Sequence, residues 1–129
     1  MDPKLNRYLL RLYSHLKNRW FIVDDSNLNE ERLSGTAVKV AGRLEIIDGS
    51  ILYFTEVVIM KGNQPIKVDY SYQFRTENEP GFFRCDPESH GRPEPYHHKH
   101  VYNQPIRQVE SAPDLFDILR EIDSLLFSE

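Results

Sequence analysis

The stretch PYHHKHVY, from Pro95 to Tyr102, places three histidines and a lysine at four consecutive positions. If Tyr96 to Tyr102 is a strand, His98 and His100 point to the same face, because side chains alternate along a strand. Imidazole titrates near neutral pH, so two such groups on one face can act as a general acid and a general base. The stretch therefore predicts a site for acid–base chemistry.

Metal-independent cleavage of RNA is one reaction that such a site can perform. It needs a base for the 2′-hydroxyl, an acid for the leaving oxygen and a cation that holds the phosphate. Lys99 and Arg84 are the predicted phosphate contacts, and a carboxylate is expected to orient a histidine. The candidate catalytic residues are His98, His100, Lys99, Glu56 and Asp86.

Two other interpretations of the histidine stretch stay open. His98 and His100 could bind a divalent metal, with Asp86, His90 or Glu56 as a third ligand, although the spacing matches no standard zinc signature. Apart from such a metal, we expect no cofactor. The stretch could also be a solvated surface with no chemical task. The spacing alone does not decide among these three.

The elements around the stretch have to position these groups. Leucines and tyrosines at 3.6-residue spacing predict an amphipathic helix over residues 3–18, with Pro3 in its first turn. Residues 20–23 are predicted as a short strand and 24–35 as a polar loop. Near the end of the chain, Ser111 is predicted as the N-cap of a second amphipathic helix.

Between the two helices the apolar period is two residues, which predicts strands. Asp48-Gly49 suits a two-residue hairpin turn, because both residues accept a positive φ. That turn pairs Ile47 with Ser50 and places Val40 opposite Val57. The hairpin then has one apolar face.

Glu56 interrupts the apolar run of the second hairpin strand. In this register it lies opposite Ala41, on the more polar side of the hairpin. A surface ion pair with Arg43 or Lys39 would explain it there and would contribute little to stability. The functional alternative is a carboxylate partner for the histidines.

The predicted fold class is α+β. It consists of an N-terminal helix, an antiparallel meander of about five strands, and a C-terminal helix packed on one sheet face, while the other face is polar and open. The strands are expected over residues 37–47, 50–60, 66–75, 82–85 and 96–102.

Composition limits the classes of function. A length of 129 residues fits a single domain, 1–129, and a net charge of −4 argues against binding nucleic acid with the whole surface, though not with a local basic groove. Cys85 is the single cysteine, which fits a reducing compartment. We see no signal peptide and no apolar run near 20 residues, so we expect a soluble cytoplasmic protein without a membrane partner.

Several segments taken together resemble the TumE-type toxin family of prokaryotic toxin–antitoxin systems. The similarity covers about residues 20–125. It is carried by AGRLEIIDGSILYFTE (Ala41 to Glu56), Tyr70 to Tyr72, FFRCDPESHGRPEPYHHKHV (Phe82 to Val101) and SAPDLFDILREI (Ser111 to Ile122). The matching positions are Asp48, Gly49, Ser50, Glu56, Tyr72, Arg84, Asp86, His97, His98, Lys99 and His100. The resemblance implies a small cytoplasmic toxin encoded with a cognate antitoxin, and it implies no particular reaction.

The leading hypothesis is therefore a toxin that acts on RNA, or on the ribosome, through the His/Lys/Arg cluster on the open sheet face. The alternative is a protein-binding module without chemistry, which acts by occupying a partner. A nucleic-acid-binding accessory protein is a third possibility, which the net charge opposes. The residues do not indicate an oligomeric state.

Overall fold

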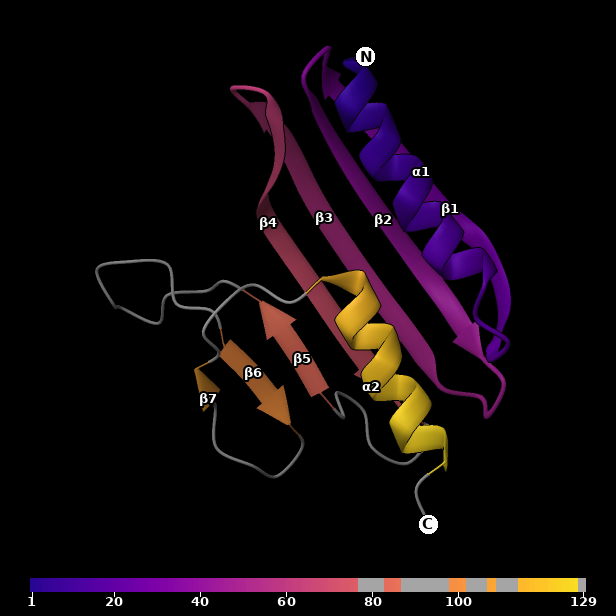
Figure 1. The fold of residues 1–129 in the computed structure, drawn as a ribbon. Coiled ribbons are helices and arrows are strands. Elements are labelled where there is room, and N and C mark those ends of the chain that lie inside the picture. Colours follow the sequence, from indigo (N-terminus) through magenta and orange to yellow (C-terminus); the bar gives the residue numbers. More distant parts are fainter. Residues whose placement is uncertain (77–82, 87–97, 102–106, 109–113, 128–129) are drawn as a thin grey trace.

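The computed structural model describes residues 1–76, 83–86, 98–101, 107–108 and 114–127, and within these residues seven strands form one antiparallel sheet in sequence order. Both helices lie on the same face of this sheet (Figure 1). The predicted α+β class is confirmed; four long strands and three short ones take the place of the predicted five. In chain order the elements are α1 Pro3–Lys17, β1 Ile22–Ser34, β2 Ala37–Ile46, β3 Ile51–Lys61, β4 Gln64–Arg75, β5 Phe83–Asp86, β6 His98–Val101, β7 Arg107–Gln108 and α2 Leu115–Phe127.

Helix α1 forms where the leucine spacing predicts it. Pro3 occupies the first turn, and the Asp2 side chain caps the helix by accepting from the backbone N–H groups of Lys4 and Leu5. Its buried stripe packs against the sheet and consists of Leu5, Leu9, Leu12 and Leu16. No helix within the described residues is long and apolar enough to cross a membrane.

The predicted loop at 24–35 is wrong, because residues 24–34 belong to β1. This strand of 13 residues lies at the sheet edge, pairs with β2 and shifts register three times along its length. None of its side chains is fully buried, so it lacks the alternating apolar pattern by which the other strands were predicted. Most of its side chains are exposed.

The β2–β3 hairpin forms as predicted, but its register differs by one residue. The loop has three residues rather than two: Gly49 N donates to Ile46 O at 2.9 Å, and Ile46 N donates to Ser50 O at 2.9 Å. Such loops commonly place a glycine in the left-handed region, and Gly49 has φ +89°. The register therefore places Val40 opposite Glu56 rather than opposite Val57.

The longer loop decides which face of β3 is covered by the helices. Leu52, Phe54 and Val58 are buried in the core, and Glu56 lies in the same row with 1% of its surface exposed. The prediction that Glu56 lies on the polar side was therefore wrong. Both faces of β3 carry apolar residues, so hydrophobicity alone did not fix the register.

Strand β4 contains a bulge that changes which of its side chains face the helices. Val57 pairs with Asp69 but Val58 pairs with Lys67, which leaves Val68 as the extra residue. Beyond the bulge Tyr70, Tyr72 and Phe74 are buried, whereas Val68 and Ile66 are exposed. The bulge thereby brings Lys67 to the face that carries Tyr72.

Helix α2 begins at Leu115 with a reciprocal capping box. Asp114 Oδ1 accepts from the Asp117 N–H at 2.8 Å, and an Asp117 carboxylate oxygen accepts from the Asp114 N–H at 3.2 Å. The predicted cap Ser111 lies outside the described residues. The buried stripe of α2 consists of Leu115, Ile118, Leu119 and Ile122.

Candidate functional site

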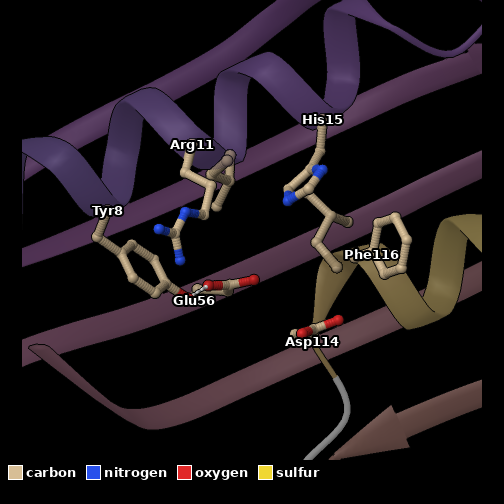
Figure 2. A pocket seen from close by; sticks show the side chains of 8 residues that line it. Tyr8, Arg11, His15, Glu56, Asp114 and Phe116 are labelled. Atoms are coloured by element: carbon tan, nitrogen blue, oxygen red, sulfur yellow. Dashed lines mark hydrogen bonds between the residues drawn. The ribbon is translucent and has the colours of Figure 1, made fainter.

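Glu56 is a buried carboxylate in the middle of β3, and both of its oxygens accept hydrogen bonds. The Tyr8 hydroxyl of α1 donates to Oε1, and the Tyr72 hydroxyl of β4 donates to Oε2 at 2.6 Å. Figure 2 shows the first of these contacts. An unsatisfied buried carboxylate would be costly, so these two donors explain how Glu56 is tolerated inside the core.

Lys67 extends this network and supplies a positive charge. Its Nζ donates to the Tyr72 hydroxyl at 2.7 Å and lies 5.0 Å from the ring centroids of both Tyr70 and Tyr72. The hydrogen bonds therefore run from Lys67 through Tyr72 to Glu56, which Tyr8 contacts from the other side. The network joins α1, β3 and β4 at one buried point.

Burial raises the pKa of the Tyr8 and Tyr72 hydroxyls far above the ordinary value for tyrosine, and the nearby Glu56 carboxylate raises both further. Both phenols therefore keep their protons at physiological pH. As neutral donors they fix the position of the two Glu56 oxygens. Each oxygen retains a second lone pair with which it can accept a proton or a further hydrogen bond.

Glu56 also lines a cavity of about 130 Å³ between α1 and the start of α2. Figure 2 shows Arg11 and His15 extending from α1 into this cavity, with Asp114 and Phe116 on the opposite side. The ring centroids of His15 and Phe116 lie 5.2 Å apart. We call this space the Glu56 cavity; its lining is Tyr8, Arg11, Leu12, His15, Glu56, Asp114, Leu115 and Phe116.

The polar groups around the Glu56 cavity are a carboxylate on a buried strand, an imidazole, a guanidinium and a second carboxylate at a helix start. A carboxylate and an imidazole can exchange protons with a substrate, and a guanidinium can hold an anionic group. The arrangement is chemically suited to acid–base reactions on an anionic substrate.

The family model of the toxin TumE matches residues 9–126. The chain belongs to the TumE toxin family. The resemblance expected from the sequence is thereby confirmed, and with it the role of a toxin in a toxin–antitoxin system. No curated protein and no solved structure matches the chain significantly.

In this TumE-family toxin, Glu56 is the predicted catalytic residue whose surroundings the structure describes. The predicted surface ion pair of Glu56 with Arg43 or Lys39 is wrong, because Glu56 is buried under the helices. Arg43 instead contacts Glu45, with 3.0 Å between guanidinium nitrogen and carboxylate oxygen. The burial thus rules out the surface ion pair as the explanation of Glu56, and its catalytic role stays a prediction.

The other predicted site residues lie on the neighbouring strands β5 and β6. The backbone register places Arg84 opposite His100 and Asp86 opposite His98, with Lys99 opposite Cys85. The sheet thus brings these positions together across two adjacent strands. Their catalytic and phosphate-binding roles stay predictions.

The metal alternative also stays a prediction. Among the residues that the structure describes, no three histidine, cysteine, aspartate or glutamate side chains form a group suited to a metal ion. The proposed ligands His98, His100 and Asp86 are placed here by their backbone register alone, and His90 lies outside the described residues.

Several groups of the TumE-family site were not singled out from the sequence. Tyr8 is one of the tyrosines whose spacing predicts the helix over residues 3–18, and Lys67 lies in the strand predicted over residues 66–75. Arg11 and His15 are four residues apart on α1, at the border of the leucine stripe, and that position was a usable signal. The role of Lys67 depends on the bulge at Val68, which has no clear signature in the sequence.

Proposed function

We propose that this toxin acts on RNA by acid–base chemistry in the Glu56 cavity. The observation that carries the proposal is the buried Glu56 carboxylate, held by two tyrosine hydroxyls, at a cavity that also presents Arg11 and His15. Structural needs alone do not account for a carboxylate there, because a buried charge usually contributes less to stability than an apolar side chain of similar size.

The residues of the cavity fit the parts of a metal-independent RNA cleavage. Glu56 accepts the proton of a 2′-hydroxyl, and the resulting oxygen attacks the adjacent phosphorus. The bond from phosphorus to the 5′-oxygen breaks, and protonated His15 donates a proton to that leaving oxygen. Arg11 balances the charge on the phosphate. The products are a 2′,3′-cyclic phosphate and a free 5′-hydroxyl.

The predicted cluster on β5 and β6 is connected to Tyr72 through the strand register. Tyr72 pairs with Cys85, which pairs in turn with Lys99, so the cluster begins one strand away from Tyr72. At about 4.8 Å per strand, Lys99 lies about 10 Å from Tyr72 along the sheet. We propose that Lys99 contacts a phosphate of the same RNA, free or on the ribosome. Arg84, His98 and His100 occupy the alternate register positions, which belong to the other face of the sheet. We therefore propose that they contact phosphate and transfer protons there, apart from the Glu56 cavity.

A cognate antitoxin is the partner that membership in a toxin family suggests. We propose that the antitoxin neutralises the toxin in the cytoplasm. The non-catalytic alternative is supported by large apolar side chains that are exposed on β3 and β4, namely Tyr53, Ile66 and Val68. Under that alternative, loss of Glu56 would change neither growth nor RNA.

The test is induced expression in a bacterial host of wild type, Glu56→Gln and the matched control Glu45→Gln, whose carboxylate is exposed on β2. We expect growth arrest and RNA fragments with wild type and with the control, and neither with Glu56→Gln at equal protein level. A His98→Ala/His100→Ala variant tests the β6 cluster in the same assay.

Purified protein is then incubated with total RNA and with ribosomes, with and without a chelator. RNA that stays intact under all of these conditions would overturn the proposed activity. Cleavage that a chelator abolishes would favour the metal alternative instead. Circular dichroism melts of each variant separate loss of chemistry from loss of folding.

A further inference from the structure

Three cations lie in one row along α1, directly beside the Glu56 cavity. Lys4, Arg7 and Arg11 are spaced by three and four residues, so they share a face of the helix, and all three side chains are exposed. The row borders the buried leucine stripe on the side that carries Tyr8. In a chain with a net charge of −4, such a row is a local positive surface on an acidic protein.

These cations line a groove of about 290 Å³ between α1 and the tip of the β3–β4 hairpin. Lys4 Nζ donates to the backbone oxygen of Asn63 at 2.9 Å, which ties the start of the helix to that tip. Among the described residues that line the groove, none carries a carboxylate. We call it the α1 groove; its lining is Lys4, Arg7, Tyr8, Arg11, Asn63, Gln64 and Pro65.

The two arginines of the α1 groove retain their hydrogen-bonding capacity. Neither Arg7 nor Arg11 forms a side-chain hydrogen bond or an ion pair within the part of the chain that the structure describes. A guanidinium group has five N–H donors in a planar fork that matches the oxygens of a phosphate. The groove therefore presents guanidinium groups that form no such contact with the described residues.

The α1 groove and the Glu56 cavity are continuous, because Tyr8 and Arg11 line both. Figure 2 shows the Arg11 guanidinium extending toward Tyr8 and Glu56, so this arginine lies at the junction. An anionic ligand that follows the row of cations reaches Glu56 at its end.

We infer that the α1 groove binds consecutive phosphates of a single-stranded nucleic acid and leads the strand to Glu56. The choice of RNA as that strand rests on the proposed function. Lys4 and Arg11 are seven residues apart, or about 10 Å along the helix axis. That length corresponds to about three phosphates at the ~3.4 Å rise of a stacked strand.

A single strand fits this geometry better than a duplex. Glu56 is 1% exposed and lines a cavity of about 130 Å³, which can admit part of one nucleotide but not a paired helix. Binding along the groove is mainly electrostatic, so it should be tolerant of sequence and should depend steeply on salt.

The test measures fluorescence anisotropy of a labelled 2′-O-methyl RNA 12-mer, which cannot be cleaved through its 2′-position. The test variant is Lys4→Ala/Arg7→Ala, and the matched control is Lys17→Ala/Lys39→Ala, which removes two exposed cations outside the groove. Arg11 is left in place because it also lines the Glu56 cavity. Thermal melts verify that both variants are folded.

We expect wild type and the control to bind the 12-mer with the same salt slope. Lys4→Ala/Arg7→Ala should bind more weakly, and its slope of log affinity against log salt should fall by about 1.4, since each phosphate contact of a single strand contributes about 0.7. Equal binding by the test variant and the control would overturn the inference, as would a wild type that does not bind.

Two further comparisons distinguish single-strand binding from binding of a duplex or a nucleotide, and distinguish the groove from the proposed cleavage. A duplex of the same sequence that binds as well as the single strand, or displacement of the 12-mer by equimolar ATP, would overturn the assignment to a single strand. If Lys4→Ala/Arg7→Ala loses binding while wild type leaves RNA intact, the result supports binding in the groove and refutes the proposed cleavage. If wild type cleaves RNA but binding is unchanged in that variant, the result supports the proposed cleavage and refutes binding in the groove.

Discussion

The two faces of β3 differ in a way that points to function. On the helix-covered face, Glu56 shares a buried row with Leu52, Phe54 and Val58. On the opposite face, the large apolar side chain of Tyr53 is 37% exposed. The strand thus carries its carboxylate on the buried face and a large apolar side chain on the exposed face. Where a sheet departs from the usual polarity of its faces, a task other than stability is the simplest explanation.

The largest effect expected from this comparison concerns packing. Phe54→Ala should lower the free energy of unfolding by about 3–5 kcal/mol, because it leaves a cavity in the core. Tyr53→Ala, at the next position on the other face, should cost about 1 kcal/mol. Urea denaturation measures both. Equal losses would mean that the face with Tyr53 is covered in solution, as it would be by a second copy or another partner.

The next effect concerns the hydrogen bonds of Glu56. Tyr72→Phe removes the hydroxyl that joins Lys67 to the carboxylate and should cost about 1.5–3 kcal/mol, because a buried charged group then lacks a partner. Tyr13→Phe is the control, since its hydroxyl bonds Glu30 at 2.6 Å at the surface, and it should cost under about 1 kcal/mol. If the two variants lose the same stability, the buried Tyr72–Glu56 hydrogen bond contributes no more to stability than the surface hydrogen bond of Tyr13.

A smaller effect concerns the space that Phe54 fills. Gly42 lies opposite Phe54, and a Cβ at Gly42 would lie 2.5 Å from the Phe54 ring and 2.6 Å from Leu28 Cδ2. Gly42→Ala should therefore cost about 1–3 kcal/mol through overpacking. Gly35→Ala, where no atom lies within 4 Å of the added carbon, is the control and should be nearly neutral. Thermal melts suffice, and equal melting temperatures would contradict the packing described for this face.

The same comparison shows which parts of the fold the sequence could predict. The leucine spacing of α1 and the existence of the β2–β3 hairpin depend on local patterns, and both were predicted. The register was not, because β3 is apolar on both faces and a three-residue loop decides between them. Strand β1 was missed because none of its side chains is fully buried, so its sequence shows no apolar alternation.

The candidate site was predictable only where a local sequence pattern marks it. Glu56 stood out as a charge in an apolar run, and that signal was sufficient to select it. Its donor Tyr8 comes from a helix 48 residues away. Lys67, which is connected to Glu56 through Tyr72, comes from the far side of a bulge. Such neighbours are set by tertiary packing, and no local pattern around Glu56 indicates them.

The smallest effect expected is a dependence of stability on alkaline pH. Burial raises the pKa of Tyr72 in the folded state, and the Glu56 carboxylate raises it further. The folded state then holds this proton more tightly than the unfolded state, whose tyrosine pKa is near 10. The stabilisation is therefore complete below about pH 10 and is lost as the pH rises above it, by about 1.4 kcal/mol at pH 11. Tyr72→Phe has no such proton, so between pH 9 and pH 11 it should lose that much less stability than wild type in urea denaturation. Equal losses in the two proteins would show that the Tyr72 hydroxyl ionises in the folded state, and would place Glu56 in a wetter environment than the helix-covered face provides.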